Sequence, residues 1–368
     1  MTQVKAWFTD DARIAAALRF ERDLAAALAA HGAITADAAE AIAHACDAFD
    51  ATGLVAAAEH AGTLAIPLVA RLRAAVPAHA AAVHHGATSQ DVADTALVLQ
   101  LAAAQPILDA ELAALATALA ASARTHARTP VMGRTLLQPA EVIGLGVRFA
   151  TWYLLVDDAR RRLAHELAGA LRVQLGGTVG TLASLGAIGP AVRATLAARL
   201  GLADAPSWHA RRDAIAGVGA ALAIATGSAG KIARDVALLS QLGEVAEPHV
   251  AGRGGSSAMP HKHNPTGCGV ALAAALRAPG LAATLVAGMP QELERGLGGW
   301  QAESPVVGEL FALAHDAARA MREVIAGLEI HAAAVPPGDH AAALDAAARF
   351  VDEALTSRGT PSRPRPGA

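Results

Sequence analysis

Residues 252–265 read GRGGSSAMPHKHNP, and this stretch is the most informative part of the 368-residue chain. It is a glycine- and serine-rich segment that ends where a helix is predicted to begin, because Asn264 is a good N-cap and Pro265 suits the first helical position. The free N–H groups and the dipole of a helix N-terminus favour anions. A simple linker does not need two serines, a lysine and two histidines at such a place. We therefore interpret residues 252–265 as a mobile lid that grips an anion.

Outward from this segment, nearly every stretch is rich in alanine. Hydrophobic residues make up 54% of the chain and aromatic residues only 3%, and alanine is the best helix former. Apolar residues recur with helical periodicity, and no alternating strand-like segment of useful length stands out. We expect an all-α protein with long helices at about 91–127, 139–172, 208–246, 265–289 and 301–329, and a short helix near 340–356.

The helical pattern predicts three parts of the chain. These are an N-terminal helical domain at 1–105, a central long-helix bundle at 106–334 that carries the loop 252–265, and a vestigial C-terminal helix with a disordered tail at 335–368. The apolar segment 269–289 is almost long enough to cross a bilayer. Arg277 and Pro279 interrupt it, so we expect a buried bundle helix kinked at the proline. Because of these interruptions, no membrane partner is expected. The surfaces of the long helices are so apolar that we expect burial between subunits.

Charge and cysteine content exclude several classes of protein. The formal net charge is −3 without a large basic block, so no nucleic-acid partner is expected. The two cysteines, Cys46 and Cys268, are too few for a disulfide framework, and the N-terminus lacks the apolar core of a signal peptide. We expect a cytoplasmic protein. Because no nucleotide-binding glycine motif, HExxH or CxxC is present, neither a cofactor nor a metal is predicted.

The segment GSSAMPHKHNP resembles the signature GSSxMPxKxNP of the fumarase/aspartase superfamily, which includes fumarases, aspartases and the argininosuccinate and adenylosuccinate lyases. The resemblance implies that Ser256 is the catalytic base or acid at carbon. It implies that Lys262 and Asn264 hold a substrate carboxylate. It further implies a homotetramer whose central helices form a 20-helix core, with each active site assembled from three chains.

Two other segments resemble the same superfamily. Residues 84–91, HHGATSQD, match its first signature region, in which Thr88 and Ser89 would bind a carboxylate. From the residues alone, Thr88 to Asp91 is a capping box, and both interpretations are compatible. Residues 133–139, GRTLLQP, match a GRTHxQ region that implies neutral hydrogen bonds from Thr135 and Gln138. The histidine that serves many members as general acid is replaced by Leu136.

The replacement at Leu136 narrows the reaction. A positioned general acid contributes about 10²–10⁴-fold when the leaving group is hydroxide or an amine. A carboxylate, whose conjugate acid has a pKa of about 4, leaves without that help. Within the superfamily, residues 174–186 and 294–303 are similar to the 3-carboxy-cis,cis-muconate cycloisomerases, in a C-terminally shortened form. The implied reaction is lactonisation of 3-carboxy-cis,cis-muconate to 4-carboxymuconolactone, in the protocatechuate branch of the β-ketoadipate pathway. The implied substrate is a small polycarboxylate.

Three further residues are candidates for substrate binding. Arg295 is predicted to contact a carboxylate, although a simple salt bridge is the alternative. His84 is predicted to bind substrate because it lies just before Thr88 and Ser89, in the same signature region. His60 aligns with a substrate-site histidine of adenylosuccinate lyases, and a helix-end histidine bonded to backbone is its alternative. Two other functions stay open: an adenylosuccinate- or argininosuccinate-type lyase that releases fumarate, and a non-catalytic structural protein with the same fold.

Overall fold

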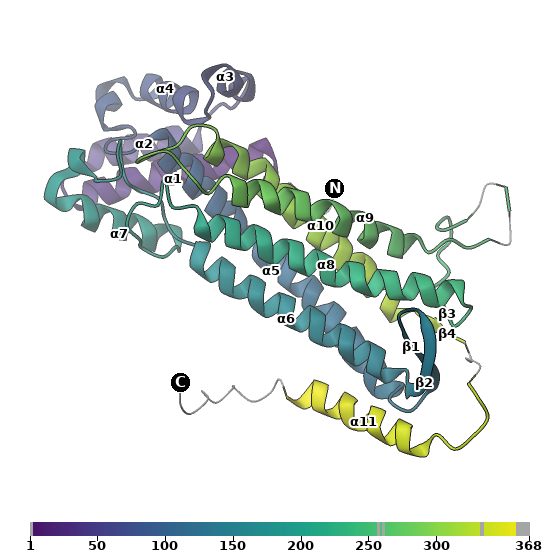
Figure 1. Ribbon diagram of the computed structural model, residues 1–368. Coiled ribbons are helices and arrows are strands. Elements are labelled where there is room, and N and C mark those ends of the chain that lie inside the picture. The colour runs from purple at the N-terminus through teal and green to yellow at the C-terminus, as the bar shows by residue number, and fades with distance from the viewer. Residues whose placement is uncertain (1–2, 256–257, 260–261, 332–334, 358–368) are drawn as a thin grey trace, which may run out of the picture. The chain divides into compact units, whose positions relative to one another are not determined.

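The structure, a computed structural model, describes residues 3–255, 258–259, 262–331 and 335–357 (Figure 1). Most of these residues are helical, which confirms the all-α prediction. The chain forms two compact units, each made of three stretches of sequence. Unit 1 contains Met1–Ile107, Ala164–Ala220 and Gly280–Ala312, and unit 2 contains Leu108–Leu163, Ala221–Pro279 and Leu313–Ala368. The predicted division at residues 105 and 334 stays a prediction.

Several of the described helices lie wholly within unit 1. They are the 3₁₀ helices η1 (Gln3–Phe8), η2 (Pro77–Ala82) and η3 (Ala183–Ile188) and the α-helices α1 (Asp10–Ala30), α2 (Ala36–Asp47), α3 (Leu54–Ala61), α4 (Ala65–Ala75) and α7 (Gly189–Leu200). The hydroxyls of Thr9 and Thr35 cap α1 and α2 by accepting the N–H three residues ahead, at 3.2 Å in each case. Helix α1 packs against α2 and α7, and its buried face includes Phe20 and Leu24.

Five long helices contribute residues to both units. They are α5 (Ser89–Thr125), α6 (Gly146–Ala170), α8 (Asp213–Gln241), α9 (Thr266–Ala287) and α10 (Gly299–Ala326). All five were predicted, and α5 and α9 begin and end within about two residues of the expected positions. The predicted helices at 139–172 and 208–246 start too early, because other structure occupies residues 138–144 and 208–212.

Within unit 2, contacts between side chains join these helices into a bundle. Arg160 of α6 pairs with Asp109 of α5, and Trp152 of α6 donates to Asp235 of α8 at 2.8 Å. Helices α8 and α9 approach each other closely where Gly230 faces Ala275. Arg322 of α10 completes the connections by donating to Glu111 of α5 at 2.8 Å.

A β-hairpin precedes α6, and the expectation that no useful strand exists was wrong here. Strand β1 (Pro130–Thr135) pairs antiparallel with β2 (Gln138–Gly144). The pairing of Val131 with Ile143 and of Met132 with Val142 outweighs the helical propensity of the neighbouring residues. The last position of β2 requires a glycine, Gly144, because a Cβ there would collide with the carbonyl oxygen of Ala127.

The remaining elements of unit 2 are small. Strands β3 (Val245–Ala246) and β4 (Glu329–Ile330) form a second antiparallel pair. The predicted C-terminal helix is present as α11 (Ala341–Thr356), which packs against β2. Its Asp345 forms an ion pair with Arg128, just before β1. Helix α11 is thereby fixed to the hairpin (Figure 1).

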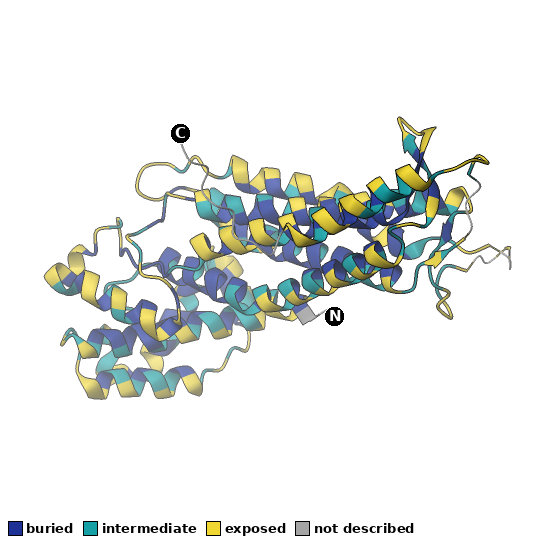
Figure 2. Cartoon of the chain, turned by 90° about the horizontal axis from the view of Figure 1, so that it is seen from below, coloured by how far each residue is buried: buried dark blue, intermediate teal, exposed yellow. Residues whose placement is uncertain are grey.

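Several long helices are unusually apolar. By length and composition alone, α5, α8 and α9 are each sufficient to cross a membrane. Only 28% of the most apolar window of α9 is buried within the chain, against 67% for α8. Leu276, on α9, is 83% exposed. Figure 2 shows exposed turns alternating with buried ones along the long helices. Pro279 lies inside α9, as expected, but the chain itself buries only part of this helix, so the predicted burial is incomplete within one chain.

Candidate active site

The N-terminus of α5 brings three of the predicted site residues together. Helix α5 begins at Ser89, directly after Thr88. Arg295, which lies 207 residues further along the chain, donates from Nη1 to Thr88 Oγ1. The start of a 37-residue helix carries unsatisfied N–H groups and a partial positive charge. A guanidinium, the Thr88 hydroxyl and a helix N-terminus therefore lie together, with Ser89 next in the sequence, at a place that suits a carboxylate.

Asp91, in the first turn of α5, holds this place in shape. The residue is fully buried. Its carboxylate accepts the Thr88 N–H at 2.9 Å, which provides the side-chain-to-backbone half of the predicted capping box. The same carboxylate accepts the N–H groups of Gly176 and Gly177, at 2.9 and 3.0 Å. Asp91 thus fixes the carboxylate-binding segment against residues 174–177, which the sequence had singled out only by resemblance.

A buried histidine also binds Asp91. The Nε2 atom of His209 lies 2.7 Å from Asp91 Oδ1, and its Nδ1 lies 3.3 Å from the hydroxyl of Ser207. Gln174 donates to both Asp91 and Ser207. Neither Ser207 nor His209 was predicted to belong to the site, because both lie in or beside an irregular stretch and nothing in the local sequence marks them.

A second buried charge cluster lies one turn further along α5. The guanidinium of Arg212 donates to both oxygens of Asp94 at 2.9 and 2.8 Å, and it also binds both oxygens of Glu303 on α10. It lies 4.7 Å from the ring centroid of Trp208. Burial raises the pKa of Asp94 and of Glu303, and the neighbouring Arg212 opposes the rise in both cases. The two carboxylates raise the pKa of Arg212 although burial opposes them. The guanidinium of Arg212 therefore connects the beginning of α10 to α5. Arg295 lies just before α10 in the sequence.

His84 occupies a constrained position just before the α5 N-terminus. It has a φ of +62°, which is unfavourable for any residue other than glycine. Its Nδ1 lies 2.6 Å from Oε1 of Glu21, a residue of α1. Burial lowers the pKa of His84, but the charge and hydrogen bond of Glu21 and the charge of Asp91 outweigh it, so the pKa is raised. The predicted proximity of His84 to Thr88 and Ser89 fits this arrangement, whereas Glu21 had not been predicted.

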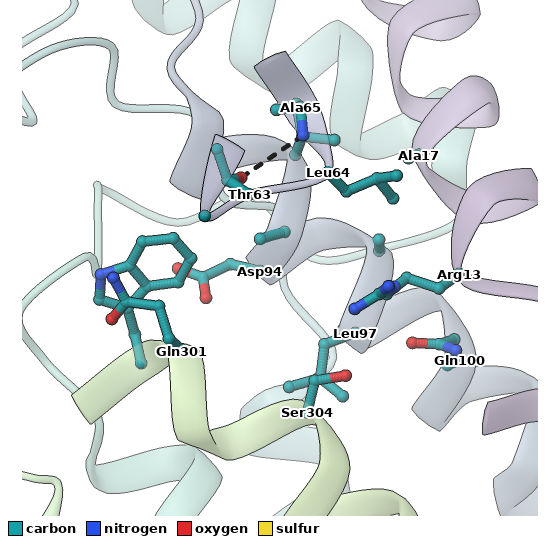
Figure 3. Close-up of a pocket in the computed structure, with 15 residues that line it drawn as sticks. Arg13, Ala17, Thr63, Leu64, Ala65, Asp94, Leu97, Gln100, Gln301 and Ser304 are labelled. Atoms are coloured by element: carbon teal, nitrogen blue, oxygen red, sulfur yellow. Dashed lines mark hydrogen bonds between the residues drawn. The ribbon is translucent and has the colours of Figure 1, made fainter. Parts of the chain in front are cut away.

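His60 lies in the last turn of α3 and is exposed. The residues that follow it, Gly62 to Ala65, line a cavity of about 120 Å³ in unit 1. Figure 3 shows Arg13 and Gln100 on one side of this cavity and Asp94 and Gln301 on another. The cavity therefore adjoins the Asp94 cluster, while a substrate role for His60 itself stays a prediction.

Unit 2 holds the predicted hairpin residues. Thr135 and Gln138 are Cα partners in the last pair of the β1–β2 ladder, and both are exposed. Leu136 and Leu137 form the two-residue turn between them, with φ values of +50° and +65°. Leu136, at the position of the superfamily histidine, is 97% exposed. Two strained and exposed leucines are unfavourable for stability alone.

The lid segment is also in unit 2. Lys262 is exposed, and its N–H donates to the carbonyl of Met259. Helix α9 begins at Thr266, and Glu247 accepts the N–H groups of Gly267 and Cys268 at 2.9 and 2.7 Å. The prediction that Asn264 caps this helix was therefore wrong, because a carboxylate from elsewhere in the chain binds the first free N–H groups. Ser256, the predicted catalytic residue, lies outside the described residues.

The structure thus gathers the predicted residues into two sets. His84, Thr88, Ser89 and Arg295 belong to unit 1, and Thr135, Gln138, Lys262 and Asn264 belong to unit 2. Among the residues that the structure describes, no group of three or more His, Cys, Asp or Glu side chains is arranged to hold a metal ion. The prediction that no cofactor is needed stays a prediction.

Comparison with known proteins places this arrangement in context. A family described as Lyase matches residues 2–280. A 3-carboxy-cis,cis-muconate cycloisomerase of Pseudomonas aeruginosa is 45% identical over 338 residues, which cover 89% of this chain and 74% of the relative. A nitrosuccinate lyase of Streptomyces davaonensis is 41% identical, over 90% of this chain and 73% of the relative.

A solved structure agrees with these matches. The 3-carboxy-cis,cis-muconate lactonizing enzyme of Pseudomonas putida superposes with a TM-score of 0.83 and 37% sequence identity, covering 98% of this chain and 78% of that one. The match extends across both units. It confirms that the helical architecture is of the type that the motifs implied.

Proposed function

Since the chain belongs to the lyase family that the fumarase/aspartase signatures define, we propose that it is a cycloisomerase that converts 3-carboxy-cis,cis-muconate into 4-carboxymuconolactone. The observation that carries the proposal is the contact of Arg295 with Thr88 at the N-terminus of α5. This contact supports the proposal because a cation, hydroxyl groups and a helix dipole together suit a carboxylate of a trianionic substrate.

In the proposed reaction, one carboxylate oxygen of the substrate adds to the alkene and closes a five-membered lactone. The electron pair of the alkene moves onto the adjacent carboxyl group and gives an aci-carboxylate. Cations and N–H donors that face this developing charge supply the main stabilisation. Arg295, Thr88 and Ser89 are the groups of unit 1 that we assign to that task. Ser256 is proposed to deliver one proton to the carbon next to this carboxyl group, which completes the addition.

Leu136 favours this type of reaction. Neither ring closure by a carboxylate nor its reversal requires a general acid at the oxygen that forms or breaks the C–O bond, because the carboxylate is already a stable anion. An exposed leucine at the hairpin tip cannot transfer a proton. A leaving group such as hydroxide or an amine needs such an acid, so the position argues against the adenylosuccinate- and argininosuccinate-type reactions.

A nitrosuccinate lyase is the second candidate, and the same observation favours it. Nitrite is also a stable anion, so its elimination from nitrosuccinate does not need an acid at position 136. The relative of that name is almost as similar to this chain as the cycloisomerase is. The two candidates differ in the third carboxylate, which only the muconate substrate carries.

The test compares the two substrates on one preparation. Loss of the muconate ultraviolet absorbance reports lactonisation, and nitrite release reports elimination from nitrosuccinate. We expect fast loss of absorbance, almost none with Ser256→Ala, and little nitrite. Rapid nitrite release without turnover of the muconate would contradict the assignment as a cycloisomerase and support the assignment as a nitrosuccinate lyase. If the folded protein converts neither substrate, both proposed activities are contradicted.

We also propose that the enzyme is a homotetramer with active sites shared between chains. The exposed apolar surface of α9 supports this assembly, since isolated proteins rarely leave so large an apolar helix in water. Light scattering of the purified protein without detergent tests it. A mass four times that of the 37.0 kDa chain is expected, and a stable monomer in water would overturn the proposal.

A further inference from the structure

A buried ion pair joins Glu21 of α1 to His84 in the segment before α5, and the Glu21 side of this pair was not predicted from the sequence motifs. Glu21 has a side chain that is 1% exposed, and the His84 side chain is 12% exposed. Their atoms Oε1 and Nδ1 are 2.6 Å apart. The other carboxylate oxygen of Glu21 is buried without a hydrogen-bond partner among the described residues. An isolated buried carboxylate is costly, so Glu21 depends on a positively charged neighbour.

The backbone at His84 shows that its position is held by its surroundings. A left-handed conformation is unfavourable for a residue other than glycine. The residue before it, Val83, is fully buried and its carbonyl accepts from Arg73 Nη2 at 3.3 Å. The carbonyl of His84 accepts the N–H of Ala87, which closes the turn leading to Thr88. Strain of this kind is common at functional sites.

The charges around the imidazole come from three helices. Glu21 of α1 and Asp91 of α5 favour the protonated ring, while burial and Arg73 of α4 oppose it, and the carboxylates prevail. Asp91 is the same residue that holds the N–H of Thr88. The raised pKa favours the protonated, cationic form of His84, which lies within electrostatic range of the carboxylate-binding segment. Because Nδ1 is bound to Glu21, the Nε2–H is the donor that remains for a ligand.

We propose that Glu21 is a positioning residue that keeps His84 as an imidazolium at the α5 N-terminus, where its Nε2–H donates to a carboxylate of the bound polycarboxylate. This inference rests on the proposed function for the identity of the substrate. It adds to Arg295 a second cation, one whose charge depends on a buried acid 63 residues away in the sequence. Substrate binding is then expected to weaken as His84 loses its proton.

The test measures His84 directly, in the full-length protein labelled with ¹³C at histidine Cε1. The His84 signal is assigned with His84→Gln. In the native protein we expect this signal to titrate above the ordinary value of 6.5 and to shift when tricarballylate, an unreactive tricarboxylate, is added. Glu21→Gln keeps the size of the side chain and removes its charge, so the His84 titration should move to lower pH. Asp23→Asn removes another buried α1 carboxylate, one that pairs with Arg199, and should leave the His84 titration in place.

Kinetics provide the second measurement. The alkaline limb of kcat/KM for the muconate should move to lower pH in Glu21→Gln by as much as the His84 titration does, with most activity retained at acidic pH. His84→Gln should lose about 10- to 100-fold at pH values where native His84 is protonated, as expected for a charged hydrogen bond, and less at higher pH. An unchanged His84 titration in Glu21→Gln, or a His84 signal that does not respond to tricarballylate, would overturn the inference. If tricarballylate shifts His84 but the muconate is not turned over, the inference stands and the proposed function fails.

Discussion

Arg295 donates a hydrogen bond to Thr88 at the first turn of α5, although 207 residues separate them in the sequence. The loop before α10 is thereby joined to the start of α5. Behind this contact, Arg212 binds Glu303 and Asp94 and so ties the same two helices together. The carboxylate-binding segment is thus supported by one exposed and one buried guanidinium.

The contact of Arg295 with Thr88 predicts coupled losses of activity. Arg295→Ala and Thr88→Val should each reduce kcat/KM by about 10- to 100-fold, because each removes a charged or polar contact to the same carboxylate. The double variant should lose less than the product of the two single losses. The control is Arg193→Ala, which breaks a pair with Asp204 outside the site. Fully multiplicative losses would show that the two residues act independently.

The Arg212 cluster predicts a large effect on stability. Arg212→Met leaves Asp94 and Glu303 buried without a cation and should lower the free energy of unfolding by about 3–5 kcal/mol. Arg322→Met removes a guanidinium that pairs with Glu111 nearer the surface, and should cost about 0–1 kcal/mol. Urea denaturation of both variants gives the comparison. Equal losses of stability in the two variants would show that the Arg212 cluster stabilises the protein no more than the Arg322–Glu111 pair does.

The turn at Leu136 and Leu137 predicts that the hairpin carries backbone strain. Leu137→Gly relieves the strain at a φ of +65° and should stabilise the hairpin by roughly 1 kcal/mol, after the greater freedom of glycine in the unfolded chain is included. Leu137→Ala removes the same apolar surface and keeps the strain, so no gain is expected. Amide hydrogen exchange at Met132 and Val142 measures the difference. Equal protection in the two variants would exclude strain as the cause.

Both cysteines are predicted to be inert in the folded protein. Burial, followed by the charge of Glu21, raises the pKa of Cys46 to about 12. Burial and Glu247 raise the pKa of Cys268 as well. Neither thiol should react with a disulfide reagent at pH 8 until denaturant is added, after which both should react. Rapid labelling of the native protein at Cys46 would contradict the described packing of α2.

The sequence predicted the parts of the site that lie in local motifs. Thr88 and Ser89 were placed at a helix start, and Arg295 was assigned to the same substrate. The supports of these residues were not predicted, since Asp91 finds its partners at Gly176 and His209, roughly 80 to 120 positions away. No periodicity or spacing encodes such a pairing, because it arises only when the loop 174–177 folds against α5.

The two incorrect predictions, at the start of α6 and at Asn264, also arose because distant residues decide the local structure. Residues 139–144 were assigned to a helix because the helical pattern of α6 follows without a clear break. The cross-strand partners that decide their conformation lie in residues 130–135. Asn264 was assigned as a helix cap from local preference, but Glu247 reaches the same N–H groups from 20 residues away. Local preference is a weak guide where a distant side chain competes for the same backbone groups.

Identification of the reaction product tests the central claim most directly. The muconate is incubated with the enzyme in D₂O and the product is examined by proton and carbon NMR. We expect the native protein to form a γ-lactone with one solvent deuterium bound to carbon. Ser256→Ala should not form this product. Recovery of unchanged muconate, or an open-chain product without the lactone, would contradict the assignment as a cycloisomerase.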